Sequence, residues 1–354
     1  MRLLIAGIRS RESRGYSFAH IERSCLRERS MVPRTRNRRP RSHRRTKTMS
    51  VAFLFPGQGS QVPGMLHALP DHAAVARTLN EVTECLGQNV LELDSVEALQ
   101  STVSVQLALL ASGVAVARAL IEDGVEPEAV TGISAGAFSA AVTADVLNLA
   151  DGVNLVRQRA EMMVELYPAG YGLAAIVGLT EKQVSILVKE VYAEQNPVYV
   201  ANINAPRQIV ISGANDAISE VLEAALKSGA RKAARLDVSE PSHCPLLAPV
   251  ADALRKSLQK THLQNPKMLY VGNVTGRALR SANAIAEDLA TNIAHGVRWH
   301  DATTVVEELG CRLFLEMPPS HVLSELARQA FPDVRTVPVV ETSLEHVARL
   351  AGQL

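Results

Sequence analysis

The sequence of 354 residues has few aromatic residues and no paired cysteines. Phe, Trp and Tyr make up 4% of the residues whereas 47% are hydrophobic, which favours the Ala, Val and Leu core common in α/β proteins. Cys25, Cys85, Cys244 and Cys311 lie far apart without a Cys-x-x-Cys pair, so neither a disulfide framework nor a zinc site is indicated. We therefore expect a protein of the reducing cytoplasm.

Basic residues are scarce after residue 48. Residues 1–48 hold 15 of the 37 Lys and Arg but only 3 of the 36 Asp and Glu, a net charge of +12, which leaves −11 for residues 49–354. An acidic body argues against nucleic-acid binding, which needs a basic surface. The longest apolar run, about 105–117, is interrupted by Gln106 and Ser112 and is followed by Arg118. We expect it to be too short to span a bilayer, and hence a soluble protein without a membrane partner.

The first 48 residues alternate Arg, Ser and Pro without helical or strand periodicity. Such a segment cannot bury enough apolar surface to fold, so we expect a disordered leader. Three explanations stay open: an organelle transit peptide, a basic arm that binds nucleic acid, or translated non-coding sequence upstream of a true start at Met49. We favour the last, an artefact, because a strand pattern begins directly after Met49.

A Gly-x-Ser-x-Gly motif spans Gly132-Ile133-Ser134-Ala135-Gly136, after an apolar stretch and before a run of small residues. In the nucleophile-elbow geometry a strand ends in a tight turn and a helix begins, which exposes the serine hydroxyl. The motif predicts Ser134 as a nucleophile and the Ala135 backbone N–H as a donor to an oxyanion. Because such a motif also occurs by chance, it needs partners.

Hydrophobic periodicity predicts an α/β body. The expected elements are strands over 51–55, around 130, over 267–271 and a final one near 312–316, and helices over 73–86, 102–121 and 151–166. The loop Pro56–Gln61 follows the first strand at its carboxyl end, where α/β sheets place their sites.

Residues 172–238 have a pattern of their own. They predict strands over 172–178, 198–204, 208–212 and 233–238, and helices over 180–192 and 215–228. This β-α-β-β-α-β order is that of a ferredoxin-like subdomain, inserted into a body made of residues 49–171 and 239–354.

A serine hydroxyl is a weak nucleophile that needs a base within hydrogen-bond reach. His243 stands just past the last predicted strand of the inserted unit, where the chain re-enters the body. His321 is the rival candidate, and spacing alone does not choose between them. The other six histidines after Met49 have no comparable setting.

Five segments together resemble the successive signatures of malonyl-CoA:acyl-carrier-protein transacylases. In chain order they are Phe55-Pro56-Gly57-Gln58-Gly59-Ser60-Gln61, the motif around Ser134, Arg159 in Leu155-Val156-Arg157-Gln158-Arg159, Pro241-Ser242-His243, and Val297-Arg298-Trp299. They cover nearly the whole body, and five in order are far more specific than one. The resemblance implies an α/β-hydrolase-like body.

The resemblance implies a role for each of these positions. Ser134 would be the acylated nucleophile, His243 its general base, and the backbone N–H groups of Gln58 and Ala135 the oxyanion hole. The Asn292 main-chain carbonyl would orient the histidine. Arg159 would bind the malonyl carboxylate, a role that suits a planar guanidinium, and the small Ser242 would favour malonyl over branched acyl groups. The reaction would be ping-pong transfer from malonyl-CoA to an acyl-carrier protein, without cofactor or metal.

Three departures from the common pattern lie at Ile133, at Met317-Pro318-Pro319 and at His295-Gly296. They resemble the epsilon subunits of bacterial malonate decarboxylases, which load malonyl onto a dedicated carrier subunit, and they imply that other decarboxylase subunits are partners. A transacylase of fatty-acid synthesis is the alternative. Two further classes stay open: a serine thioesterase or hydrolase, which would use water as the acceptor, and an inactive scaffold that docks a carrier protein.

Overall fold

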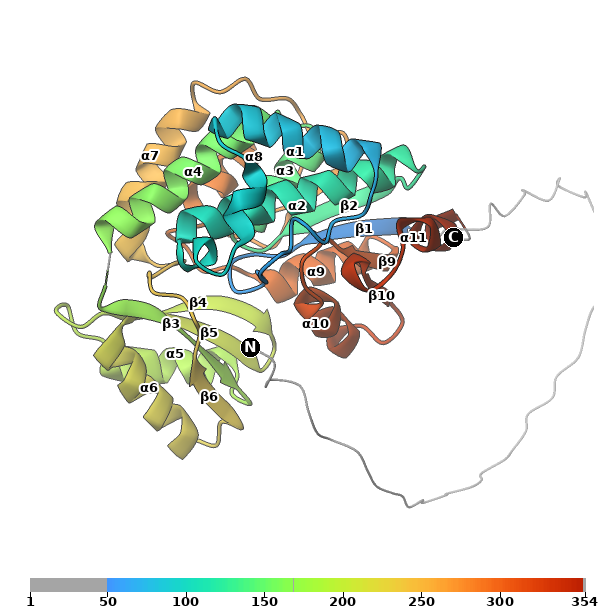
Figure 1. Cartoon of the computed structure of the whole chain (residues 1–354). Helices are drawn as coiled ribbons and strands as arrows, with labels where there is room; N and C mark the ends of the chain where they lie inside the picture. The colour runs from blue at the N-terminus through green and yellow to red at the C-terminus, as the bar shows by residue number, and fades with distance from the viewer. Residues whose placement is uncertain (1–49, 168, 353–354) are drawn as a thin grey trace, which may run out of the picture. The chain divides into compact units, whose positions relative to one another are not determined.

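The computed structural model describes residues 50–167 and 169–352 (Figure 1). The predictions for residues 1–48 and for a start at Met49 lie outside these residues. The larger part is built on a six-stranded sheet of order β10-β9-β1-β2-β7-β8, in which neighbours are parallel except for β8 against β7. The strands are β1 (Ser50–Phe55), β2 (Pro127–Gly132), β7 (Leu269–Val271), β8 (Ala278–Leu279), β9 (Cys311–Glu316) and β10 (Arg335–Pro338).

Helices cover both faces of this sheet, which forms the middle of three layers. The helices are α1 (Ala73–Leu86), α2 (Thr102–Glu122), α3 (Gly136–Thr143), α4 (Leu149–Leu166), α7 (Ala248–Leu258), α8 (Ala282–Thr291), α9 (Trp299–Glu308), α10 (Val322–Ala330) and α11 (Leu344–Gly352). Short 3₁₀ turns lie at Val90–Asp94, Ala98–Gln100, Pro245–Leu247 and Val339–Glu341. Figure 1 shows α1, α2 and α4 on one side of β1 and α9 and α10 on the other.

Alternation along β1 creates the two cores. Phe53 and Phe55 join the larger cluster with α1–α4, α7, α8 and α11, whereas Ala52 and Leu54 join the smaller one with α9 and α10. Successive side chains of a strand point to opposite faces, so a strand buried on both faces has no polar positions. This explains why residues 51–55 read as an unbroken apolar run.

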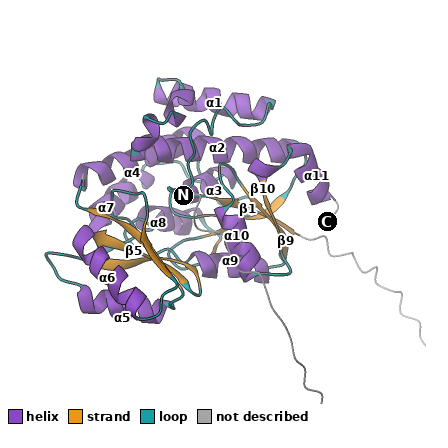
Figure 2. Cartoon of the chain, turned by 60° about the horizontal axis from the view of Figure 1, so that its bottom comes forward, coloured by secondary structure: helices purple, strands orange, loops and turns teal. Residues whose placement is uncertain are grey.

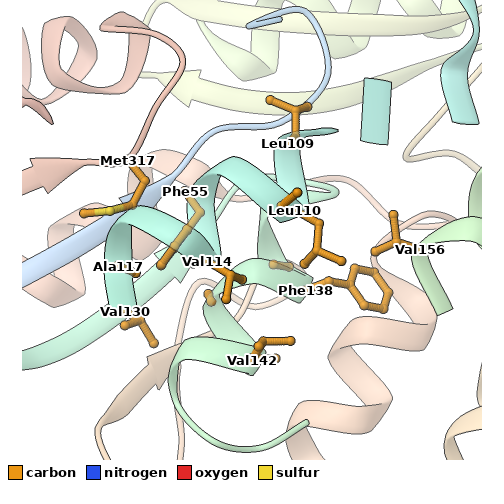
Figure 3. Packing of buried hydrophobic residues seen from close by; sticks show 14 of the residues in the cluster. Phe55, Leu109, Leu110, Val114, Ala117, Val130, Phe138, Val142, Val156 and Met317 are labelled. Carbon is orange, nitrogen blue, oxygen red and sulfur yellow. The ribbon is translucent and has the colours of Figure 1, made fainter. Parts of the chain in front are cut away.

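Helix α2 is the central helix of the larger cluster. Its 21 residues are long and apolar enough to cross a membrane, so the expectation that this run is too short is wrong. Gln106 and Ser112 do not end it, because both lie inside the protein. Of its most apolar stretch, 83% is buried against the rest of the chain, as in a core helix. Figure 3 shows Val114 of this helix in the cluster with Phe55 and Phe138.

A second sheet of four antiparallel strands has the order β4-β5-β3-β6. Figure 2 shows its strands in orange beside α5 and α6. Its elements follow in the predicted order: β3 (Tyr171–Val177), α5 (Glu181–Val191), β4 (Val198–Ala205), β5 (Gln208–Ala214), α6 (Asn215–Lys227) and β6 (Lys232–Arg235). Helices α5 and α6 bury their apolar residues against one face and form a separate hydrophobic cluster. Strand β6 ends at Arg235, three residues earlier than predicted.

The last strand was predicted wrongly. The strand near 312–316 is present as β9, but β10 follows it and pairs with it in parallel at the edge of the sheet. β10 is only four residues long, begins with the exposed Arg335 and ends at Pro338. Edge strands tolerate proline and charge, so such a segment carries no strand periodicity that could reveal it.

Backbone hydrogen bonds join the second sheet to the segment between α8 and α9. The Val297 N–H donates to the Ala201 carbonyl at 2.8 Å, and the Ile203 N–H donates to the Val297 carbonyl at 2.8 Å. Val297 thereby forms a parallel bridge with Asn202 of β4. Segment 292–297, which follows α8, is thus held by the second sheet, and it borders the site described next.

Candidate active site

Ser134 occupies the turn between β2 and α3. Its φ of 58° lies in the left-handed region, as expected for a nucleophile elbow. A Cβ at Gly132 would lie 2.0 Å from the Gly136 carbonyl oxygen, and one at Gly136 would lie 2.3 Å from that of Phe55. Both glycines of the motif are therefore required by space.

Asn273, a residue that sequence reasoning missed, fixes this turn from the neighbouring strand. Its Oδ1 accepts from the Ser134 backbone N–H at 2.9 Å, and its Nδ2 donates to the Gly132 carbonyl at 2.8 Å. The Asp288 carboxylate accepts from the backbone N–H groups of Asn273 and Val274 at 3.0 and 2.9 Å. Burial nevertheless raises the pKa of Asp288. The available signal was position, since Asn273 follows β7 at its carboxyl end.

His243 lies beside the serine as predicted. Its Nε2 is 2.7 Å from Ser134 Oγ, and its Nδ1 is 2.6 Å from the Asn292 carbonyl oxygen. A carbonyl oxygen can only accept, so Nδ1 carries the proton and Nε2 is free to accept from the serine hydroxyl. Burial, and then the charge of Arg159, lowers the pKa of His243 to about 3, which keeps the ring neutral. The rival His321 is half exposed and faces Glu341 at 3.2 Å.

Arg159 reaches the serine from α4. Its Nη2 donates to Ser134 Oγ at 3.0 Å, and its Nη1 donates to Gln106 Oε1 at 2.5 Å. The side chain is 1% exposed, and burial lowers the pKa of the guanidinium to about 9. Its Nε has no partner, and no carboxylate pairs with it, among the described residues. A buried cation in this state can bind an anion at little further desolvation cost.

Two backbone N–H groups, those of Gln58 and Ala135, lie in the loops that meet at the Ser134 turn. The Ala135 N–H stands at the start of α3, and Gln58 follows β1 in the adjacent loop. Gly57 lets the two loops approach, because a Cβ there would lie 2.6 Å from the Ile133 carbonyl oxygen. Neither the Gln58 nor the Ala135 N–H donates to another residue in the part of the chain that the structure describes. These two N–H groups can donate hydrogen bonds to a negatively charged oxygen.

Ser242 is buried next to the histidine. Its backbone N–H donates to Ser212 Oγ at 2.9 Å, which anchors the segment before His243 to β5. Among the described residues its hydroxyl makes no hydrogen bond to Ser134, His243 or Arg159.

A cavity of about 450 Å³ opens beside His243. It is lined by α5, β4 and the segments that carry Pro245 and His295, including Tyr192 and Tyr199. The two tyrosine rings meet edge to face with centroids 5.5 Å apart. Within residues 50–167 and 169–352, no cluster of three or more His, Cys, Asp or Glu side chains is suited to hold a metal ion.

Comparison with known proteins defines the class. Residues 52–351 match the family model described as the acyl transferase domain. The match spans most of the chain, so the protein belongs to this family, and it is an acyltransferase.

The individual relatives carry a more specific name. The chain is 34% identical over 294 residues to the malonyl CoA-acyl carrier protein transacylase of Bacillus subtilis (strain 168), covering 82% of this chain and 93% of the relative. It is 35% identical over 284 residues to the enzyme of that name from Escherichia coli (strain K12), covering 78% and 92%.

Solved structures agree with these relatives. The malonyl CoA-acyl carrier protein transacylase of Coxiella burnetii superposes with a TM-score of 0.82 at 32% identity, over 87% of this chain and 98% of that one. A malonyl-transacylase in complex with its type II PKS acyl-carrier protein gives a TM-score of 0.80 at 34% identity, over 84% and 98%.

Proposed function

We propose that the protein transfers a malonyl group from malonyl-CoA to the thiol of an acyl-carrier protein through an ester on Ser134. The observation that carries the proposal is Arg159, a buried guanidinium without a carboxylate partner among the described residues, 3.0 Å from the serine oxygen. A malonyl group carries a free carboxylate that this planar fork can bind with two hydrogen bonds. An acetyl group would leave the cation unpaired.

In the first half-reaction, Ser134 Oγ attacks the thioester carbonyl while His243 Nε2 takes the hydroxyl proton. The Asn292 carbonyl holds Nδ1–H and stabilises the ring as it becomes charged. The backbone N–H groups of Gln58 and Ala135 receive the oxyanion. The carbon–sulfur bond then breaks, and the histidine returns its proton to the CoA thiolate.

The second half-reaction runs the same steps in reverse with the carrier thiol. His243 removes the thiol proton, the thiolate attacks the malonyl ester, and Ser134 leaves with the proton. The cavity beside His243 offers the arm of the carrier an approach to the base, and most of its lining surface is apolar.

The acceptor we propose first is the carrier subunit of a malonate decarboxylase. The support is sequence: Ile133, Met317-Pro318-Pro319 and His295-Gly296, three departures that resemble the epsilon subunits of those complexes. The alternative is the carrier of fatty-acid synthesis, favoured by relatives named malonyl CoA-acyl carrier protein transacylase. Transfer rates from malonyl-loaded protein to each of the two carriers decide between them.

Two other classes are less well supported. A thioesterase would need the same serine and histidine, but it would release free malonate, so the ratio of transfer to hydrolysis separates it. A docking scaffold has no need of a hydroxyl 2.7 Å from a neutral imidazole, an arrangement that activates the serine.

The test is intact-mass spectrometry of the full chain after brief exposure to malonyl-CoA or acetyl-CoA. We expect a malonyl adduct that is lost in Ser134→Ala. Arg159→Ala should lower malonyl loading by about 100-fold or more while acetyl loading changes far less, because removing the partner of a buried charge costs roughly 3 kcal/mol. No adduct on the unaltered protein, or equal malonyl and acetyl adducts irrespective of Arg159, would overturn the proposal.

Two structural assignments accompany this function. We propose that residues 172–238 form a ferredoxin-like subdomain inserted into an α/β-hydrolase-like body, supported by the strand order β6-β3-β5-β4 and by a separate core. A cytoplasmic location is proposed from the unpaired cysteines Cys85, Cys244 and Cys311.

A further inference from the structure

A buried carboxylate with no part in the reaction described above lies near the base. Glu240 precedes His243 by three residues and is 8% exposed. Its Oε2 accepts from Thr102 Oγ1 at 2.9 Å. Thr102 is the first residue of α2, where the positive end of the helix dipole favours a negative charge.

The Thr102 hydroxyl is also hydrogen-bonded to Gln58, which connects Glu240 to the site. Thr102 Oγ1 accepts from Gln58 Nε2 at 3.0 Å, and Gln58 Oε1 accepts from Gln106 Nε2 at 3.4 Å. Gln106 Oε1 in turn accepts from Arg159. With the serine and histidine, these contacts form one path: Glu240, Thr102, Gln58, Gln106, Arg159, Ser134 and His243. Both ends of the path lie in the four-residue segment 240–243.

The direction of each hydrogen bond in this path is fixed at its two ends. Arg159 can only donate, and an ionised Glu240 can only accept. The hydroxyl and the two amides between them can each point either way, but only one arrangement pairs a donor with an acceptor at every contact of the path. In that arrangement Gln106 presents its oxygen to Arg159, and Gln58 presents its oxygen to Gln106.

We propose that Glu240 is a positioning residue for the acyl-carboxylate clamp: through Thr102, Gln58 and Gln106 it holds the Arg159 guanidinium in register with Ser134. The inference deepens the proposed function and rests on it. Glu240 does not touch the acyl group. It acts by fixing the orientation of the Thr102 hydroxyl and of the two amides. Thr102 and Gln106 are buried, where an unsatisfied polar atom is costly, and Gln58 is partly buried.

Removing the Glu240 carboxylate allows hydrogen bonds of the path to change direction. In Glu240→Leu, the Thr102 hydroxyl can donate to Gln58 instead, which turns the Gln58 amide and brings its nitrogen against that of Gln106. One amide then loses its partner, and Arg159 loses the fixed oxygen at Gln106. Glu240→Gln keeps an oxygen that accepts from Thr102, so it preserves the original direction.

The experiment measures loading of Ser134 from malonyl-CoA and from acetyl-CoA, as initial rates by intact mass. We expect Glu240→Leu and Thr102→Val to lower the malonyl-to-acetyl rate ratio by about tenfold, the equivalent of one hydrogen bond to a charged group, mainly by raising KM for malonyl-CoA. Glu240→Gln and Thr102→Ser, which keep the oxygens, should restore the ratio to within about twofold.

Glu316→Gln is the matched control. Glu316 is also a buried carboxylate, but it accepts from Ser320 and from the backbone of Leu323 and Ser324 at the start of α10, away from the path. This variant should lower thermal stability without changing the ratio. A ratio in Glu240→Leu equal to that in Glu316→Gln, or a fall that Glu240→Gln does not reverse, overturns the inference while the function stands. If the unaltered protein forms no malonyl adduct, both the proposed function and this inference are overturned.

Discussion

Arg159 combines burial, charge and proximity to the serine in a way that makes the site depend on pH. Burial lowers the pKa of its guanidinium to about 9, and burial together with this cation lowers the pKa of His243 to about 3. At a pH between these two pKa values, Arg159 is charged and His243 is neutral. Loading of an acyl group that carries a carboxylate needs this combination.

The value of kcat/KM, which reports the free enzyme, should depend on pH. Above about pH 9 an Arg159 with its lowered pKa gives up its proton, so kcat/KM for malonyl-CoA should fall. The value for acetyl-CoA should change much less, because it gains nothing from the cation. Initial loading rates with the two donors from about pH 6 to about pH 10, corrected for spontaneous thioester hydrolysis, measure this. Parallel profiles for the two donors would contradict it.

The residues of the site divide by how visible they are in the sequence. Ser134, His243, Arg159 and Asn292 sit in or near short motifs, and the structure brings them together. The residues that support them carry no motif. They are Asn273, Gln106, Thr102 and Glu240. Of these, only Gln106 could be noticed in the sequence, as a polar residue within an apolar helix. Burial of its amide requires a hydrogen-bond partner, but residue spacing does not identify that partner.

At the scale of elements, the site is made by loops at the carboxyl ends of adjacent parallel strands. The loops after β1, β2 and β7 supply Gln58, Ser134 and Asn273. The order of strands in the sheet puts these loops side by side, as is usual for α/β sheets. Periodicity predicted β1, β2 and β7 because they are buried and apolar, and it missed β10 because a short edge strand is not.

The elbow itself gives a prediction about stability. Gly136→Ala should lower the free energy of unfolding by about 3 kcal/mol or more, since the new methyl group would overlap the Phe55 carbonyl and neither backbone can move without its neighbours. Gly352→Ala is the matched control: Gly352 lies in α11 with no atom within 4 Å of the new carbon, so the same change should be neutral or stabilising. Chemical denaturation measures both. Equal effects of the two changes would refute the steric reading of the motif.

At the scale of the whole molecule, α2 connects the core to the site. Its middle is buried among α1, α3 and α4, and its first two turns hold Thr102 and Gln106. The sequence suggested an apolar run too short for a membrane, whereas the structure gives a helix of membrane-spanning length enclosed by protein. Length and hydropathy cannot distinguish a membrane-spanning helix from a central core helix, because both are long and apolar.

Hydrogen exchange on the full chain tests this enclosure. Amides in the middle of α2 should exchange only by global unfolding, because opening that helix dismantles the larger core. Amides of α5, where only Val184 and Val188 are buried, should exchange by local opening and at least about tenfold faster. Exchange in α2 as fast as in α5 would show that this helix is not the centre of the fold.

The bridge between Val297 and β4 limits how the protein can be re-engineered. Exchange of the four-stranded unit between family members is an obvious route to a new carrier preference, because that unit walls the cavity beside His243. Strand β4 of that unit also holds segment 292–297 by backbone hydrogen bonds. The carbonyl of Asn292, the first residue of this segment, orients the His243 ring. Chimeras that carry segment 292–297 along with the transplanted unit should keep their catalytic rate, and those that leave it behind should lose rate before they change preference.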